Sequence, residues 1–149
     1  LRRVAEERAG DRAGTRRGMS VVVSDRGDGE IRGRMTTPSA AVVLVTVPEE
    51  VDADAFAHDL VSERVAACVS VFPVMTSVYR WEGAIERGRE RQLLIKTQAT
   101  RLDDLRRRVL ERHPYDTPEF LVLSVTGGES RYLEWVASSV EVASTTSGD

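Results

Sequence analysis

Residues 66–97 read AACVSVFPVMTSVYRWEGAIERGRERQLLIKT, and this stretch predicts one long β-hairpin. The first arm is rich in Val, Phe, Thr and Tyr, which fit a pleated, half-buried surface, and the second arm closes on Leu-Leu-Ile at residues 93–95. Gly83 lies between the arms, where it can adopt the positive φ angle that a tight reversal requires. Residues 86–91 (ERGRER) are expected to form a solvated segment of the second arm.

The first arm changes its apolar parity partway along. Val69 and Val71 are apolar at odd positions, whereas Val74 and Val78 are apolar at even positions. Because a slip of one residue turns every side chain to the other face, we expect a bulge or bend at residues 72–73, where proline is tolerated. Both arms exceed the usual strand length of about 5–6 residues. We therefore expect the hairpin to reach into a neighbouring subunit.

Length and composition limit the class of protein. The 149 residues are enough for one domain, and they contain no apolar run long enough to span a bilayer. Residues 21–23 (VVV) are too short for an ordinary signal peptide. A single cysteine, Cys68, cannot form an internal disulfide, which fits a reducing cytoplasm. We therefore expect a cytoplasmic protein without a membrane partner.

Charge and composition divide the chain into three parts. Residues 1–40 carry nine Arg and six Asp or Glu, a net charge of +3, and lack apolar periodicity, so they predict a disordered leader. Residues 41–140 predict the folded domain, and residues 141–149 predict a flexible tail. The chain beyond residue 40 has a net charge of −6, which argues against nucleic acid as the main partner.

Apolar patterns predict the remaining elements. Residues 41–47 (AVVLVTV) and 119–125 (EFLVLSV) predict strands that are apolar on both faces. A helix is expected over residues 52–64, with Asp52 as its N-cap. Two more helices are expected, one from a capping box at residues 100–103 to about residue 112, where His113-Pro114 stops it, and one that Ser130 caps.

The resulting order is β-α-β-β-α-β with an extra C-terminal helix, which predicts an α+β, ferredoxin-like domain. Right-handed crossovers place both crossover helices on one face of the sheet and leave the other face bare. An exposed apolar sheet face is a surface for association. The pattern therefore predicts an oligomer, without fixing the number of subunits.

Five segments resemble the CutA family, the divalent-cation tolerance proteins. They are VTVPEE, RVAACVSVFPVMTSVYRWEG, LLIKT, HPYDTPEFLVLSV and YLEWV, in that order across about residues 41–140. The resemblance implies a ferredoxin-like domain in a compact homotrimer similar to the PII signalling proteins, with the long hairpins packed across subunits. It also implies a role in metal tolerance and the binding of copper. This chain has Val45 where some members carry Cys, and Arg112-His113 where some carry a His pair.

The candidate metal ligands are His113, Asp116 and Glu119. Imidazole with carboxylates suits several divalent ions, and the resemblance favours copper. The alternative for His113 is a cationic group that stabilises the C-terminus of the preceding helix. Cys68 is expected to act as a small core hydrophobe.

A second candidate is a ligand pocket at a subunit boundary, formed by two tyrosines, a tryptophan, a lysine and a glutamate. These residues are Tyr79, Trp81, Lys96, Tyr115 and Glu119. Lys96 is the one lysine beside 20 arginines, which indicates a position that favours a compact ammonium group. Glu119 of the same subunit or of a neighbouring one is its expected partner. The alternative is ordinary interface packing, in which Tyr and Trp are enriched.

No catalytic motif is found, so we expect a protein that is not an enzyme. The leading hypothesis is a cytoplasmic homotrimer that binds a divalent metal, copper above others, and contributes to metal tolerance. The alternative is a PII-like small-molecule sensor or adaptor that uses inter-subunit clefts. The partners expected are other copies of the chain, a possible small-molecule ligand, and a protein partner that the sequence does not name.

Overall fold

A computed structural model describes residues 39–143 of the chain. The predicted leader lies outside this range except for its last two residues, and the predicted tail lies outside it from residue 144 onward. The described elements, in chain order, are β1 (Ala40–Pro48), α1 (Ala53–Ser62), β2 (Cys68–Val71), β3 (Met75–Trp81), β4 (Ala84–Gln98), the 3₁₀ helix η1 (Ala99–Arg101), α2 (Leu102–Arg112), β5 (Leu121–Ser124) and α3 (Ser130–Ser139).

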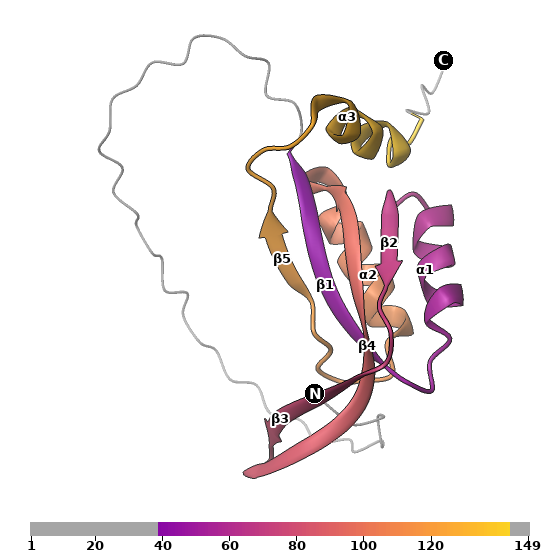
Figure 1. Cartoon of the computed structure of the whole chain (residues 1–149). Helices are drawn as coiled ribbons and strands as arrows, with labels where there is room; N and C mark the ends of the chain where they lie inside the picture. Colours follow the sequence, from indigo (N-terminus) through magenta and orange to yellow (C-terminus); the bar gives the residue numbers. More distant parts are fainter. Residues whose placement is uncertain (1–38, 144–149) are drawn as a thin grey trace, which may run out of the picture.

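The strands form one antiparallel sheet around β4, which at 15 residues is the longest element (Figure 1). The sheet has the order β2-β4-β1-β5, and β3 pairs with the other half of β4. The β1–β4 register runs from Ala40 opposite Gln98 to Pro48 opposite Glu90. This arrangement confirms the predicted α+β, ferredoxin-like class with an additional C-terminal helix.

The long hairpin has the predicted break in its first arm. β2 ends at Val71 and β3 begins at Met75, so residues 72–74 separate the part of the arm with apolar odd positions from the part with apolar even positions. Phe72 N–H still donates to Gln92 O at 2.9 Å, which keeps the arm attached to β4 across the break. The turn places Glu82 at φ 45° and Gly83 at φ 82°, the left-handed pair of a tight hairpin.

The core lies between one face of the sheet and helices α1 and α2 (Figure 1). Alternate residues of β1 and β4 point into it, as the period of two in a strand requires. The helices contribute apolar residues spaced three or four apart, which share one helix face. Its fully buried members are Val43, Val45, Val47, Leu60, Leu93, Ile95, Leu105 and Val109.

The opposite sheet face is covered by neither α1 nor α2, as the crossover rule predicted; we call it the bare face. In β1 and β4 its residues alternate with the core residues. The bare face carries Val42 and Leu44 of β1, Cys68 and Ser70 of β2, Leu94 and Lys96 of β4, and Leu121 and Leu123 of β5. Leu121 and Leu123 are 54% and 50% exposed. Such a surface is apolar enough to favour association.

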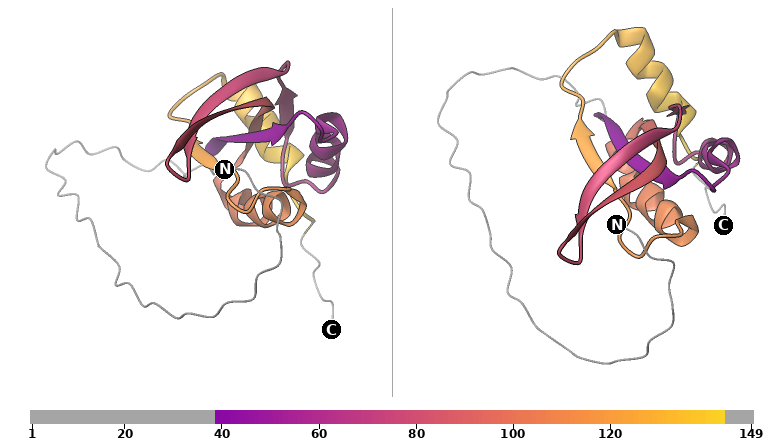
Figure 2. Two further views of the ribbon diagram at one scale, coloured as in Figure 1. Left: turned by 90° about the horizontal axis from the view of Figure 1, so that it is seen from below. Right: turned by 60° about the horizontal axis from the view of Figure 1, so that its bottom comes forward.

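Helix α3 lies across the end of the sheet remote from the hairpin tip (Figure 1). Figure 2 shows it on the side of the sheet opposite α2. Val136 and Val140 are buried against Ala67 and Ala40, which joins α3 to this end of the bare face.

The helix boundaries agree with the sequence in part. Asp52 accepts from Ala55 N–H at 3.0 Å as the predicted N-cap of α1, and His113 is extended and ends α2. The capping box at residues 100–103 is wrong, because residues 99–101 form the turn η1 and α2 then begins without a side-chain cap. Glu129, not Ser130, caps α3, because Glu129 holds the extended conformation before the first helical residue.

The segment 86–91, expected to be solvated, belongs to β4, and within it Gly88 and Glu90 are buried. The predicted last strand is shorter than its apolar run, since β5 spans four residues.

Within residues 39–143, no helix is both long and apolar enough to cross a bilayer.

Replacement of Leu105 tests the core with a matched control in the same helix. Leu105 is fully buried, whereas Leu110, also in α2, is 38% exposed. We expect Leu105→Ala to lower the free energy of unfolding by about 2–5 kcal/mol. Leu110→Ala should cost roughly 1 kcal/mol or less, because that side chain retains much of its contact with water. Equal losses in chemical denaturation would contradict the assignment of the core.

Candidate functional site

His113 is held by hydrogen bonds at both ring nitrogens. Nε2 lies 2.7 Å from Thr46 O, and Nδ1 lies 3.1 Å from Tyr115 N. A carbonyl oxygen accepts only and a backbone N–H donates only, so the proton is on Nε2 and Nδ1 is the acceptor. The imidazole is therefore a neutral ring with a fixed tautomer, and it joins the end of α2 to β1.

The environment keeps this ring neutral. His113 is 8% exposed, and burial lowers its pKa below the ordinary value. The hydrogen bond to Thr46 O and the negative charge of Glu90 act in the opposite direction and offset part of that effect. The cationic helix cap considered from the sequence is therefore wrong at neutral pH, because desolvation disfavours the charged ring.

Next to His113 lies a buried carboxylate with hydroxyl donors. Glu90 is 4% exposed; Ser77 Oγ donates to its Oε2 at 2.8 Å and Tyr115 OH to its Oε1 at 3.2 Å. The rings of His113 and Tyr115 have centroids 4.8 Å apart. We call Ser77, Glu90, His113 and Tyr115 the acidic cluster. It joins the hairpin, β4 and the loop after α2.

The predicted pocket residues come from β3, β4 and the loop between α2 and β5, and a pocket that they form at a subunit boundary stays a prediction. Tyr79 and Trp81 are on β3, and Tyr79 OH donates to Glu86 Oε2 at 3.2 Å. Lys96 is six residues beyond Glu90 on the same strand, which is roughly 20 Å at the rise of a β-strand. Tyr115 belongs to the acidic cluster through the hydrogen bond from its hydroxyl group to Glu90.

The expected pairing of Lys96 with Glu119 does not form within one chain, and a pairing between chains stays a prediction. Glu119 Oε2 accepts from Gln92 Nε2 at 3.0 Å, whereas Lys96 Nζ lies 3.7 Å from Cys68 Sγ. The strand register explains this outcome, because Cys68 stands directly opposite Lys96 and Gln92 is four residues away. Cys68 is half-buried on the bare face, not enclosed in the core.

The predicted metal ligands all lie in the segment between α2 and β5. Asp116 is exposed, Glu119 is half-buried, and His113 has both nitrogens engaged. A metal at His113 would displace the Tyr115 N–H or the Thr46 carbonyl. Within residues 39–143, no three His, Cys, Asp or Glu side chains are grouped closely enough to hold a metal ion. The metal site therefore stays a prediction.

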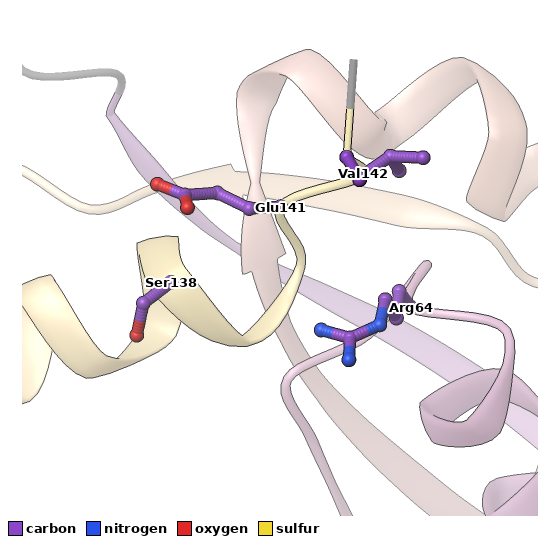
Figure 3. Close-up of a pocket in the computed structure, with 5 residues that line it drawn as sticks. Arg64, Ser138, Glu141 and Val142 are labelled. Carbon is purple, nitrogen blue, oxygen red and sulfur yellow. The ribbon is translucent and has the colours of Figure 1, made fainter. Parts of the chain in front are cut away.

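An open cavity of about 660 Å³ separates the end of α3 from the turn after α1. Arg64, Ser138, Glu141 and Val142 border it (Figure 3). The Glu141 carboxylate points away from the Arg64 guanidinium group in this view, so the two charges do not converge on one ligand position.

Sequence reasoning missed the two most informative members of the acidic cluster, Ser77 and Glu90. The alternation of side chains along β4 could have indicated that Glu90 faces the sheet surface and not the solvent. Glu90 has the same parity as Lys96 and lies opposite Met75, a half-buried residue of β3. The charged neighbours at residues 89 and 91 obscured that signal and made the segment resemble a solvated one.

The fold and this arrangement define a small α+β protein with an open ferredoxin-like sheet, a bare face suited to association, and a buried acidic cluster at the base of a long hairpin. Residues 41–139 match the family model described as CutA1 divalent ion tolerance protein. The chain belongs to the CutA divalent-ion tolerance family, as the sequence resemblance indicated.

Similar proteins cover nearly the whole described domain. A divalent-cation tolerance protein CutA of Pectobacterium atrosepticum is 44% identical over 101 residues, which is 68% of this chain and 92% of the relative. The chloroplastic protein CutA of Arabidopsis thaliana is 43% identical over 104 residues, 70% of this chain and 57% of that protein. The crystal structure of CutA1 from Oryza sativa aligns with a TM-score of 0.68 at 42% identity, covering 71% of this chain and 97% of that one.

Because His113 is neutral in the folded chain, the stability of the fold depends on pH, and the lowered pKa gives the direction of that dependence. The unfolded chain takes up a proton on this ring at its ordinary pKa of about 6.5, whereas the folded chain resists it to lower pH. The contribution to stability is therefore complete above about pH 6.5 and is lost as pH falls toward the folded pKa. We expect the stability difference between the parent and His113→Gln to be larger at neutral pH than in acid.

Urea denaturation at about pH 7.5 and about pH 5 measures this difference. His58→Gln is the matched control, because His58 is an exposed residue of α1. The His58 variant should follow the parent at both pH values. If the free energies of unfolding of the parent and His113→Gln differ by the same amount at both pH values, the assigned tautomer and the buried neutral state of His113 are wrong.

Proposed function

We propose that the protein is a cytoplasmic homotrimer, not an enzyme, that binds a divalent cation of the copper type and so contributes to tolerance of metal ions. The single observation that carries the proposal is the bare face. In one chain it leaves Leu121 and Leu123 about half exposed, on a sheet whose other face packs against α1 and α2. A closed ring of copies buries this surface, and membership of the divalent-ion tolerance family supplies the cation.

Assembly can also complete a metal site at the loop between α2 and β5. The candidate ligands Asp116 and Glu119 are accessible, and His113 lies at the start of the same loop. A second chain can bring further ligands to this loop, or move Tyr115 N–H away from His113 Nδ1 and free that lone pair. Carboxylate and imidazole together suit a divalent transition metal.

The location rests on the free thiol of Cys68, which fits a reducing compartment. A plant relative is named chloroplastic, and the structure of an archaeal relative is described as periplasmic, so the names of related proteins refer to more than one compartment. The proposal for this chain is the cytoplasm.

The assembly is tested by light scattering of the full chain at micromolar concentration. We expect the mass of three chains, and we expect Leu121→Glu with Leu123→Glu to shift the mass toward that of one chain, because two carboxylates on the bare face are costly to bury. Val61→Glu is the control, since Val61 is 41% exposed on α1, the helix on the other side of the sheet. A stable folded monomer of the parent chain would refute the trimer.

The metal site is tested by calorimetric titration of copper(II) and zinc(II). We expect Asp116→Asn and His113→Gln to weaken copper binding by about tenfold or more, which is the usual effect of losing a metal ligand or its orienting partner. Asp116→Asn is the sharper variant, because Asp116 is exposed and its loss leaves the fold intact. His58→Gln should bind as the parent does. Unchanged affinity in the Asp116 and His113 variants would exclude this loop as the metal site.

A second candidate function is small-molecule sensing at inter-subunit clefts. It is favoured by two tyrosine hydroxyl groups that each donate to a carboxylate, Tyr79 to Glu86 near the hairpin tip and Tyr115 to Glu90 at the hairpin base. Titration of a nucleotide and metabolite panel beside the metals separates the two functions. Saturable binding of one metabolite, without a response to copper, would favour the sensor.

A further inference from the structure

A second cavity lies within one chain, under α3 and away from the acidic cluster. Helix α3, the start of β1, Lys96 of β4 and the loop after β5 enclose about 240 Å³. It is at the end of the sheet remote from the hairpin tip, where α3 crosses the bare face (Figure 1). Its apolar lining includes Ala41, Val42, Val125, Leu133 and Val136.

Among the described residues that border this cavity, Lys96 carries the one charge. The side chain is half-buried, and its one hydrogen bond within residues 39–143 is the 3.7 Å contact from Nζ to Cys68 Sγ. An ammonium group has three donors, and a thiol sulfur is a weak acceptor. The remaining donors of Lys96 are therefore available to a stronger acceptor at the edge of an apolar space.

The charge and the lining together define the ligand. A single ammonium group balances a single negative charge, so a carboxylate fits better than a phosphate dianion. Apolar side chains from α3 and β1 favour a hydrocarbon body over a sugar or a peptide backbone, whose polar groups would lose hydrogen bonds there. At about 30 Å³ for each water molecule of the liquid, the cavity has room for roughly eight non-hydrogen atoms.

We propose that this cavity binds a small monocarboxylate with a branched aliphatic or aromatic body. The carboxylate accepts from Lys96 Nζ, and the body lies among Val42, Leu133 and Val136. The site differs from the inter-subunit clefts considered above, because residues of one chain enclose it. The proposal therefore stands apart from the copper site and does not depend on it.

The test uses the full chain and a matched pair of probes, 4-methylpentanoate and its neutral isostere 4-methylpentanamide. Each has about eight non-hydrogen atoms, which matches the cavity. Backbone-amide NMR titration locates the binding, and we expect saturable shifts in Ala41, Val42, Gly127, Gly128 and residues of α3. The carboxylate should bind at least about tenfold more tightly than the amide, the usual value of a hydrogen bond to a charged group.

Two variants separate the charge of Lys96 from its packing. Lys96→Met keeps an apolar stem, so it should remove the preference for the carboxylate while leaving the binding of the amide within about twofold. Cys68→Ala removes the competing sulfur acceptor and should retain the preference. The comparison of acid and amide on the parent chain decides the proposal even if Lys96→Met fails to fold.

Three outcomes would overturn the proposal. Equal affinity for acid and amide would remove the role of the ammonium group, and shifts confined to the hairpin would place binding elsewhere. Absence of saturable binding by either probe would mean that the cavity is closed in the assembled protein. A crystal structure of the assembly with a neighbouring chain's side chain in this space would identify that side chain as its occupant.

Discussion

The backbone pairing of β4 is the constraint on which the rest of the structure depends. β1, β2 and β3 all bond to this one strand, and β5 is attached through β1. Because side chains alternate along a strand, the register at one point fixes the face of every residue from Ala84 to Gln98. The same alternation sends Leu93 and Ile95 into the core and Glu90 and Lys96 to the opposite face. Core, acidic cluster and α3 cavity are thus consequences of a single strand register.

The two faces of this sheet differ in how far helices cover them. One is closed by α1 and α2, whereas the other meets only α3 at one end, within the described residues. Burying the exposed half of one leucine contributes roughly 1 kcal/mol, so the leucines of β5 favour contact with another apolar surface. Within residues 39–143, β5 is also an edge strand of the sheet, and an edge strand can pair with another strand.

Most of the fold could be predicted from the sequence, because hydrophobic parity and helix-stop signals act locally. The parity change between Val71 and Val74 gave the break between β2 and β3, and His113-Pro114 gave the end of α2. The side-chain partners could not be predicted in the same way. Lys96 meets Cys68 and not Glu119 because strand pairing places residues 28 apart in the chain directly opposite each other. Such pairings depend on the register, which local composition does not encode.

Glu90 illustrates why a charged sequence segment can still be buried. A carboxylate is expensive to desolvate, and it persists in an interior position when hydrogen-bond donors replace the lost water. Ser77 and Tyr115 supply two such donors from different parts of the chain. Tyr115 also donates its backbone N–H to His113, so one residue ties both buried titratable groups to the loop after α2. That loop carries Asp116 and Glu119, and any ligand bound there therefore acts on the base of the hairpin through hydrogen bonds that already exist.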